Sequence, residues 1–285
     1  MSPTLRPLNP TIYSSRPKAE APAAVLNLLR DQLSLQTWLL IGAAIQSILF
    51  ILPIRPTYTI APVFLALLYT LIDTLLVTFN FKSNSYLAGA RLTKFSALIP
   101  NKDGSFSLKK DDADEGRVVI LLLGVKINHP LGLLQPQAQE IGAHFQAMVN
   151  ELNENARTNG FLGSTGFLGT DDRTSKSEIM TTFYFSNLKA VEDFALNNPT
   201  HRKGWDAWNR MAKEGKNRHI GIYHEVYEAP KGRWENVYLN MQKTGMANTK
   251  FLVEGKEGEG WAEPNVDVSR GLLASHKGRT QGLAN

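Results

Sequence analysis

Cysteine is absent from the 285 residues of this chain. Without thiols the chain cannot form disulfides, use a thiolate nucleophile, or bind zinc, haem or an iron–sulfur cluster through sulfur. The surplus of positive charge is also small, because 31 Lys and Arg residues stand against 26 Asp and Glu residues and leave a net charge of +5. No tight basic run accompanies this surplus, so we expect no nucleic-acid partner.

Several catalytic signatures are missing as well. The chain has no G-x-S-x-G nucleophile elbow, no dinucleotide fingerprint after a strand and no Gly-Lys-Ser/Thr phosphate loop. His224 and Glu225 superficially resemble a zinc-protease motif, but the second His is missing and a strand would point these neighbours to opposite faces. The sequence therefore gives no sign of a serine hydrolase, a dinucleotide-dependent enzyme or a zinc protease.

Charge is nearly absent from one long segment. Residues 33–80 contain only two charged side chains, Arg55 and Asp73. Two apolar stretches, 38–52 and 60–79, lie on either side of a turn with two prolines. The second stretch has the roughly 20 residues that a bilayer-spanning helix needs, and the first is borderline. We predict a two-helix transmembrane hairpin with Asp73 facing the partner helix or lying near an end; a buried hairpin in a soluble protein is the alternative.

The flanks of this hairpin, which we place at residues 37–81, are basic on both sides. These basic residues are Arg6, Arg16, Lys18 and Arg30 before it, and Lys82, Arg91 and Lys94 after it. The positive-inside rule predicts that both flanks are cytosolic, with the endoplasmic reticulum as the expected membrane. We expect residues 1–36 to be a flexible proline-rich arm and residues 82–116 to be a juxtamembrane linker, in which Lys109–Glu115 is a solvated loop.

The polar part of the chain predicts an α+β fold. Periodicity and turn residues indicate strands at 117–128, 160–169, 178–185 and 219–227, and helices at 136–156, at 188–196 and from Pro199. The order βαββαβ is that of a ferredoxin-like unit, an antiparallel sheet with helices on one face. The bare face would be buried by pairing with a second copy into a β-barrel. We expect residues 247–285 to be a polar, glycine-rich and loosely packed tail.

Imidazole and aromatic side chains are the remaining candidates for chemistry. His201, Trp205 and Trp208 have the i, i+4, i+7 spacing of one helix face, while His224 lies within a predicted strand. Ordinary roles compete for each: core packing for the tryptophans, a helix start for His201 and a turn for His129. Spacing alone indicates a pocket of unknown purpose.

Longer motifs carry a resemblance to a known family. They are Asn128–Gly132, Gly160–Gly163, Pro199–His201 with Trp205 and Trp208–Asn209, Ile222–Tyr227 and Trp234–Asn240. Together they resemble the fungal ABM-type (antibiotic-biosynthesis-monooxygenase-like) enzymes of secondary-metabolite clusters such as the fumagillin cluster, including their membrane-anchored members. The resemblance covers about residues 80–246, with the enzymatic domain at 117–246. One departure is Met241–Met246, where the family pattern has a double proline.

The resemblance implies a dimeric α/β barrel and a monooxygenase that acts on a lipophilic conjugated polyketide, polyene or terpenoid intermediate. It also implies oxygen chemistry without metal, haem or flavin, in which the substrate anion itself reduces dioxygen. Its catalytic candidates are His224 as base or proton shuttle, His201 as orienting or relay group, Asn128 as hydrogen-bond donor and His129. Its substrate-binding candidates are Trp205, also a possible donor, Trp208, Tyr184 and Tyr223.

Two further readings stay open. The chain could be a haem-binding dimeric α/β barrel of the aldoxime-dehydratase type, with His201 or His224 as the proximal ligand. It could instead be a non-enzymatic, membrane-tethered carrier that hands a lipophilic intermediate to a neighbouring enzyme. A Soret band would support haem, turnover without a chromophore would support the cofactor-free enzyme, and binding without oxygen uptake would support the carrier.

Overall fold

The chain divides into two compact units, one inserted into the other. The computed structural model describes residues 5–17, 33–107, 116–169, 178–230, 233–256 and 258–280. Leu33–Ala90 form one unit, here called the apolar unit, and the chain before and after it forms the main unit. Part of the expected arm, the charged run Lys109–Glu115 and the last five residues of the expected tail lie outside the described residues.

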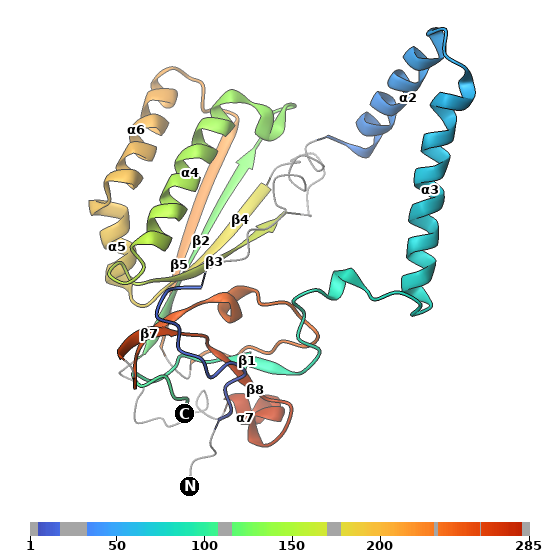
Figure 1. The fold of residues 1–285 in the computed structure, drawn as a ribbon. Helices are drawn as coiled ribbons and strands as arrows, with labels where there is room; N and C mark the ends of the chain where they lie inside the picture. The colour runs from blue at the N-terminus through green and yellow to red at the C-terminus, as the bar shows by residue number, and fades with distance from the viewer. Residues whose placement is uncertain are drawn as a thin grey trace. The chain divides into compact units, whose positions relative to one another are not determined.

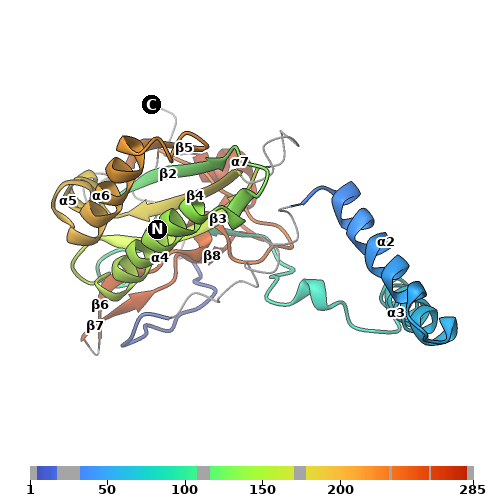
Figure 2. The same ribbon diagram turned by 90° about the horizontal axis from the view of Figure 1, so that it is seen from above.

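A four-stranded antiparallel sheet is the centre of the main unit. Its strands are β2 (Arg117–Ile127), β3 (Phe161–Leu168), β4 (Glu178–Phe185) and β5 (Ile220–Pro230), in the order β3-β4-β2-β5. Its helices are α4 (Pro136–Glu154), α5 (Leu188–Asn197) and α6 (Pro199–Lys213). Figures 1 and 2 show all three helices on the same face of the sheet. The predicted α+β class with an antiparallel sheet and helices is confirmed.

The face under the helices is apolar because alternate residues of each strand point to it. Val119, Leu121 and Leu123 of β2 join the cluster that the helices cover. Local signals set the helix boundaries: α4 starts at a proline in its first turn, and the side chain of Asn187 accepts a hydrogen bond from the backbone N–H of Ala190 at the start of α5. Gly160, with φ of 70°, makes the left-handed turn before β3.

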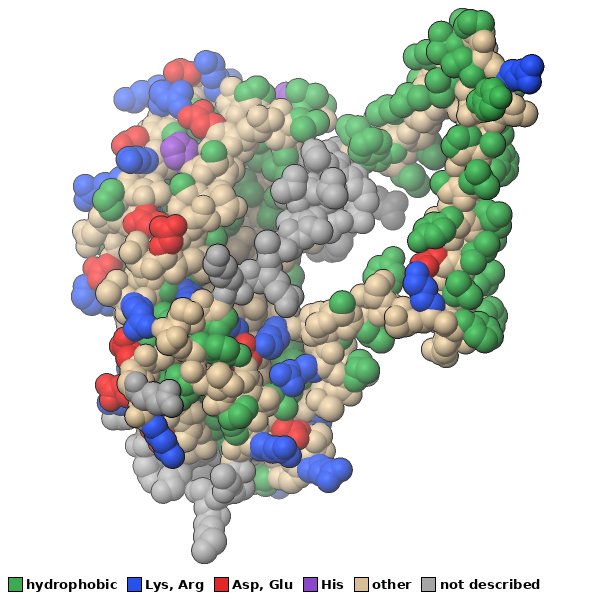
Figure 3. Space-filling model, viewed as in Figure 1, with side chains coloured by type: hydrophobic (Ala, Val, Ile, Leu, Met, Phe, Trp, Pro, Cys, Tyr) green, Lys and Arg blue, Asp and Glu red, His purple; other side chains and the backbone are tan. Residues whose placement is uncertain are grey.

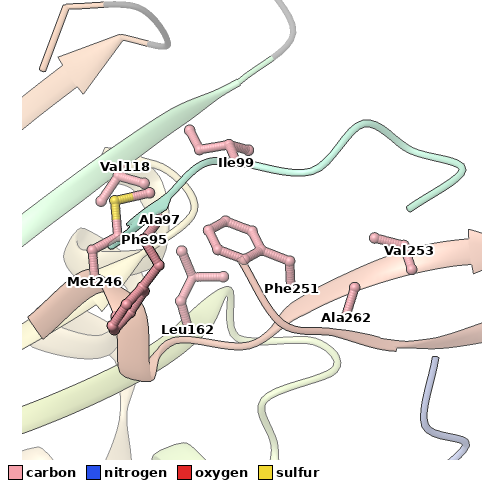
Figure 4. Packing of buried hydrophobic residues seen from close by; sticks show 10 residues of the cluster. Phe95, Ala97, Ile99, Val118, Leu162, Met246, Phe251, Val253 and Ala262 are labelled. Atoms are coloured by element: carbon pink, nitrogen blue, oxygen red, sulfur yellow. The ribbon is translucent and has the colours of Figure 1, made fainter. Parts of the chain in front are cut away.

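The opposite face of the sheet, here called the open face, is covered at one end by the chain itself. The covering layer consists of β1 (Phe95–Ala97) paired with β8 (Asn265–Asp267), β6 (Phe251–Gly255) paired with β7 (Gly258–Ala262), and the 3-10 turn η4 (Gly245–Asn248). Val118 and Leu162 of the sheet pack in one buried cluster with Phe95 and Met246 of this layer, as Figure 4 shows. The prediction of a fully bare face was therefore wrong.

The packing also corrects the expected tail, linker and arm. Val266 and Val268 are fully buried, as is Phe95 in the expected linker. In the expected arm, Pro7 and Tyr13 form antiparallel bridges to Val266 and Trp261. The apolar runs in the described parts of these segments are only one to three residues long, and their packing partners lie far away in the sequence. The remaining short elements are η3 (Gly132–Leu134), η5 (Leu272–Ala274) and α7 (His276–Thr280).

The apolar unit contains α2 (Leu35–Ile51), α3 (Pro56–Thr78) and the 3-10 turn η1 (Ser85–Leu87). Neither α2 nor α3 has a buried residue, and Figure 3 shows hydrophobic side chains over most of the visible surface of this unit. Among the described helices, α3 alone is long and apolar enough to cross a membrane, because α2 has 17 residues. Of the two predicted spans, the structure thus supports one by length and composition. The Asp73 carboxylate forms an ion pair with Lys82, so its charge is compensated near the end of α3.

Candidate functional site

His224 lies on the helix face of the sheet. It stands opposite Leu123 in the β2–β5 register, and Leu123 belongs to the cluster beneath the helices. The helices leave this part of edge strand β5 uncovered: His224 is exposed, and its same-face neighbours Ile222 and Val226 are 45% and 38% exposed. The position combines an accessible imidazole with exposed apolar neighbours on the same strand.

His201 is fixed at the start of α6 by a short chain of hydrogen bonds. The Asn198 side chain accepts from the backbone N–H of His201 at 2.9 Å and caps the helix. Its Nδ2 donates to Oε1 of Glu151 on α4 at 2.6 Å. The imidazole ring lies between Phe194, at a centroid distance of 5.2 Å, and Trp205, at 6.4 Å. The helix cap therefore positions the His201 backbone, and the ring contacts two aromatic side chains.

The His201 imidazole is held neutral and has one buried nitrogen without a partner. Burial lowers its pKa, and the nearby His224 lowers it further, while the Ala195 backbone acts in the opposite direction. That backbone contact does not give Nδ1 a hydrogen bond of good geometry, because Nδ1 is buried and unpaired. A buried, unpaired polar atom costs about 1–3 kcal/mol, and such atoms mark places where a water or ligand completes the structure.

Three predicted site residues are thus brought together: His201, His224 and Trp205. The two imidazoles are close enough to influence each other electrostatically, and the exposed Trp205 indole meets the His201 ring edge-on at an interplanar angle of 82°. Trp208 lies on the same helix but packs in the core with Ile127 and Ile220.

Asn128 and His129 lie at the end of β2, away from this cluster. Asn128 is five residues beyond Leu123, the partner of His224, which is about 17 Å along a strand. The backbone N–H of Asn128 donates to the His219 carbonyl at 2.7 Å, and the rings of His129 and His219 meet at 5.2 Å. The structure therefore forms a second, separate imidazole pair there.

Tyr184 and Tyr223 lie on the open face, opposite to His224. Tyr184 is next to Gly245 of the covering layer, and burial together with the neighbouring Tyr238 raises the pKa of Tyr184 to about 12. The Tyr223 ring lies directly on Gly124, where an added Cβ would be 2.0 Å from its Cε1 atom. These two substrate-binding candidates are not brought together with the imidazole pair.

The sequence reasoning missed the residues that hold the covering layer in place. Asn236 imitates a neighbouring strand: its Oδ1 accepts from the Ala97 N–H at 2.7 Å and its Nδ2 donates to the Ala97 carbonyl at 2.9 Å. Tyr238 stacks on Phe95 with ring centroids 4.9 Å apart. Both belong to the Trp234–Asn240 motif, so the motif was a usable signal, but only for a resemblance and not for this role.

A buried ionic cluster was also unforeseen. Lys243 donates to both carboxylate oxygens of Glu263 at 2.7 Å, and the Lys250 ammonium lies 3.2 Å from Oε1. Burial raises the pKa of Glu263, but the two lysines outweigh it and the pKa is lowered. At Lys250 burial dominates and lowers the pKa, although Glu263 opposes this. No triad of potential metal-binding side chains occurs among the described residues.

Comparison with known proteins agrees with the enzymatic reading. Residues 118–246 match the family described as Monooxygenase af470-like. The whole chain is similar to monooxygenase af470 of Aspergillus fumigatus, with 30% identity over 284 residues and 98% of each chain covered. The chain belongs to the monooxygenase af470-like family and is a monooxygenase.

Solved structures are similar to parts of this chain at low identity and low TM-score. SnoaB, a cofactor-independent oxygenase from Streptomyces nogalater, is 16% identical with a TM-score of 0.27, over 39% of this chain and 92% of SnoaB. The aldoxime dehydratase OxdRE is 16% identical with a TM-score of 0.34, over 54% of this chain and 42% of that enzyme. A putative antibiotic biosynthesis monooxygenase from Deinococcus radiodurans is 15% identical with a TM-score of 0.25, over 39% and 91%.

Proposed function

We propose that this monooxygenase oxidises a lipophilic, conjugated polyketide, polyene or terpenoid intermediate of fungal secondary metabolism and uses no metal, haem or flavin. The observation that carries the proposal is the His201–His224 pair. One imidazole is kept neutral by burial with an unpaired nitrogen, and the other is exposed beside an apolar strand surface. A neutral imidazole accepts a proton, and the apolar surround favours a substrate that delocalises the resulting charge.

The proposed reaction balances with dioxygen as the only co-reactant. A CH₂ group of the conjugated substrate loses one proton to an imidazole, and the carbanion combines with dioxygen to give a peroxide anion, which takes up one proton and becomes a hydroperoxide. Loss of one water then leaves a carbon–oxygen double bond, so one oxygen atom enters the product and the other leaves as water. His201 accepts the proton, His224 passes it to solvent, and the Trp205 indole binds the conjugated chain or donates to the developing oxyanion.

The remaining predicted site residues have weaker support. Asn128 and His129 stay predictions, because about 17 Å along the strands separates them from His224. Tyr184 and Tyr223 lie on the other face of the sheet, and Trp208 is a core residue in the main unit.

We also propose that the enzyme is a membrane-anchored homodimer of the endoplasmic reticulum with its catalytic domain in the cytosol. The exposed apolar surface of α2 and α3 and the basic residues on both flanks support the anchor, with both helices inserted. The exposed aromatic residues Phe167, Tyr223 and Tyr227 of the sheet support contact with a second copy. We propose that residues 117–246 form the enzymatic domain and that the covering layer stabilises it by packing on one end of its sheet.

The most direct test combines oxygen uptake with absorption spectroscopy on the full-length chain in detergent. Deletion of the gene in its host should accumulate a precursor, which then serves as the substrate. We expect oxygen consumption by colourless protein. A Soret band that is required for turnover would replace this proposal with the haem enzyme. Precursor binding without oxygen uptake would favour the carrier, which the monooxygenase family already argues against.

A further inference from the structure

The segment Leu5–Pro17, here called the strap, precedes the apolar unit but is built into the main unit. Tyr13 and Trp261 exchange two backbone hydrogen bonds of 2.9 and 2.8 Å, and the Leu8 N–H donates to the Asn265 carbonyl at 2.9 Å. The Asp267 N–H donates to the Arg6 carbonyl at 3.0 Å. The strap is thus joined to the C-terminal part of the main unit at two points, by isolated antiparallel bridges at Pro7 and Tyr13.

Arg16 fixes the end of the strap that leads toward the apolar unit. Its guanidinium lies between two aromatic rings, 5.0 Å from the Phe161 centroid and 5.1 Å from that of Trp261. Its Nη2 donates to the Leu162 carbonyl at 2.7 Å, and burial lowers its pKa to about 10. Phe161 and Leu162 belong to β3, so Arg16 joins the strap directly to the central sheet.

Ile12 fits a hollow that three glycines make possible. An added Cβ would lie 2.5 Å from Ile12 Cγ2 at Gly260, 2.8 Å from Cδ1 at Gly255 and 3.1 Å from Cδ1 at Gly104. Real Cβ contacts are essentially never shorter than 3.0 Å, so a larger residue at Gly260, where an added Cβ would also lie 2.9 Å from the Tyr13 carbonyl oxygen, would push the strap away, whereas one at Gly255 would displace the Ile12 side chain. The glycine-rich composition after residue 246 therefore has a structural reason, which is close approach of another backbone.

We infer that the strap forces the apolar unit to enter and leave the bilayer on the same side, so that α2 is a second membrane crossing. This rests on the membrane anchoring proposed above. If α3 crossed alone, the strap and residues 261–267 would lie on opposite sides of the membrane and could not pair. The argument uses backbone pairing and is independent of the positive-inside rule.

The length of α2 then indicates the kind of bilayer it fits. Its 17 residues span about 25 Å, which approaches the hydrocarbon thickness of about 27 Å in the endoplasmic reticulum and is well short of the 32–33 Å of the plasma membrane. The 23 residues of α3 span about 34 Å and fit the same bilayer when tilted. The lipid partner of this hairpin is therefore a thin bilayer.

Thiol labelling of the full-length chain tests the topology, because the chain has no cysteine and each variant carries one unique thiol. The exposed positions Thr11 in the strap, Thr57 at the start of α3 and Lys203 on α6 are changed singly to cysteine. With a membrane-impermeant maleimide on sealed microsomes, we expect Thr11→Cys and Lys203→Cys to react alike and Thr57→Cys to react only after detergent. Reaction of Thr11→Cys and Lys203→Cys on opposite sides would overturn the inference and leave the anchor intact. Reaction of Thr57→Cys in sealed vesicles would refute the second crossing.

A double-mutant cycle tests whether Ile12 of the strap contacts Gly255 in solution. Gly255→Ala should lower the melting temperature of the purified full-length protein by about 3 °C or more while Ile12 is present, and should have little effect in the Ile12→Ala background. Gly142→Ala on α4, where an added Cβ meets nothing within 4 Å, is the control for a glycine replacement without a clash. An equal effect of Gly255→Ala in both backgrounds would show that the strap does not lie on these glycines.

Discussion

The two faces of the central sheet are made from the same four strands but are completed in different ways. Helices cover most of the helix face and leave an uncovered strip of β5 at His224, beside His201 and Trp205. The open face is closed at one end by the covering layer, where Tyr184 and Phe95 pack, and exposes aromatic residues elsewhere. Incomplete cover on the helix face leaves the candidate site accessible, whereas added cover on the open face buries apolar side chains.

The largest difference between the faces should appear in catalysis. We expect His201→Ala and His224→Ala each to reduce oxygen uptake by about 100-fold or more, the usual range for loss of a general base or relay. His219→Ala, at the separate pair with His129, should cost far less. Circular dichroism and the dimer mass serve as controls for folding. Equal losses for all three variants would assign His201 and His224 a structural role.

Stability should depend strongly on the covering layer. Phe95 is fully buried against Tyr238, so Phe95→Ala should lower the free energy of unfolding by about 3–5 kcal/mol. Leu92 is in the same segment but 63% exposed, and Leu92→Ala should change little. Denaturant unfolding measures the free energy of unfolding of the two variants. Little change in both variants would indicate that this segment is a loose juxtamembrane linker.

A smaller loss of stability should distinguish a glycine on the open face from a glycine on the helix face. Gly124→Ala places a Cβ in the Tyr223 ring on the open face and should cost about 1–3 kcal/mol, with relief in the Tyr223→Ala background. Gly166→Ala in β3 has 3.9 Å to the nearest Thr181 atom and should cost less. Similar losses at Gly124 and Gly166 would mean that the Tyr223 ring does not rest on Gly124 in solution.

The smallest expected effect is on the pH dependence of stability. The folded-state pKa of His201 is lowered below its ordinary value, so the unfolded chain binds the proton more readily as pH falls below about 6.5. His201 should therefore lower the free energy of unfolding as pH falls from about 6.5 to its folded-state pKa. Above that window, the difference in free energy of unfolding between the wild type and His201→Ala should be constant. A wild-type curve that runs parallel to the variant throughout would show that the His201 pKa is unshifted.

Patterns within single segments explain how much of the fold could be predicted. The continuous apolar run in 118–123 predicted β2 and the helical spacing in 136–156 predicted α4, because each pattern lies within a single segment of the chain. The covering layer could not be predicted in this way. Phe251, Trp261 and Val266 belong to short apolar runs or stand alone, and their partners lie in the strap, β1 and the sheet.

The candidate site was likewise predictable only where it depends on residues close together in the sequence. The i, i+4 spacing was enough to place His201 and Trp205 together on α6. Strand alternation could suggest that Tyr223 and His224 face opposite ways, but only the register of β5 against β2 shows which of them lies under the helices. The family resemblance grouped Asn128 and His129 with His224, yet the strand length separates them from His224.

The sequence by itself determined the apolar helices, the order of strands and helices in the central unit, and the family to which the chain is related, because each depends on residues close together along the chain. Only the tertiary structure decided that the strap Leu5–Pro17 and residues 247–280 belong to the main unit and that His224 is near enough to His201 to lower its pKa. The physical reason is that strand pairing and close packing join residues more than 200 positions apart, as in the 2.9 Å bond from Tyr13 to Trp261, and no local pattern encodes such a partner.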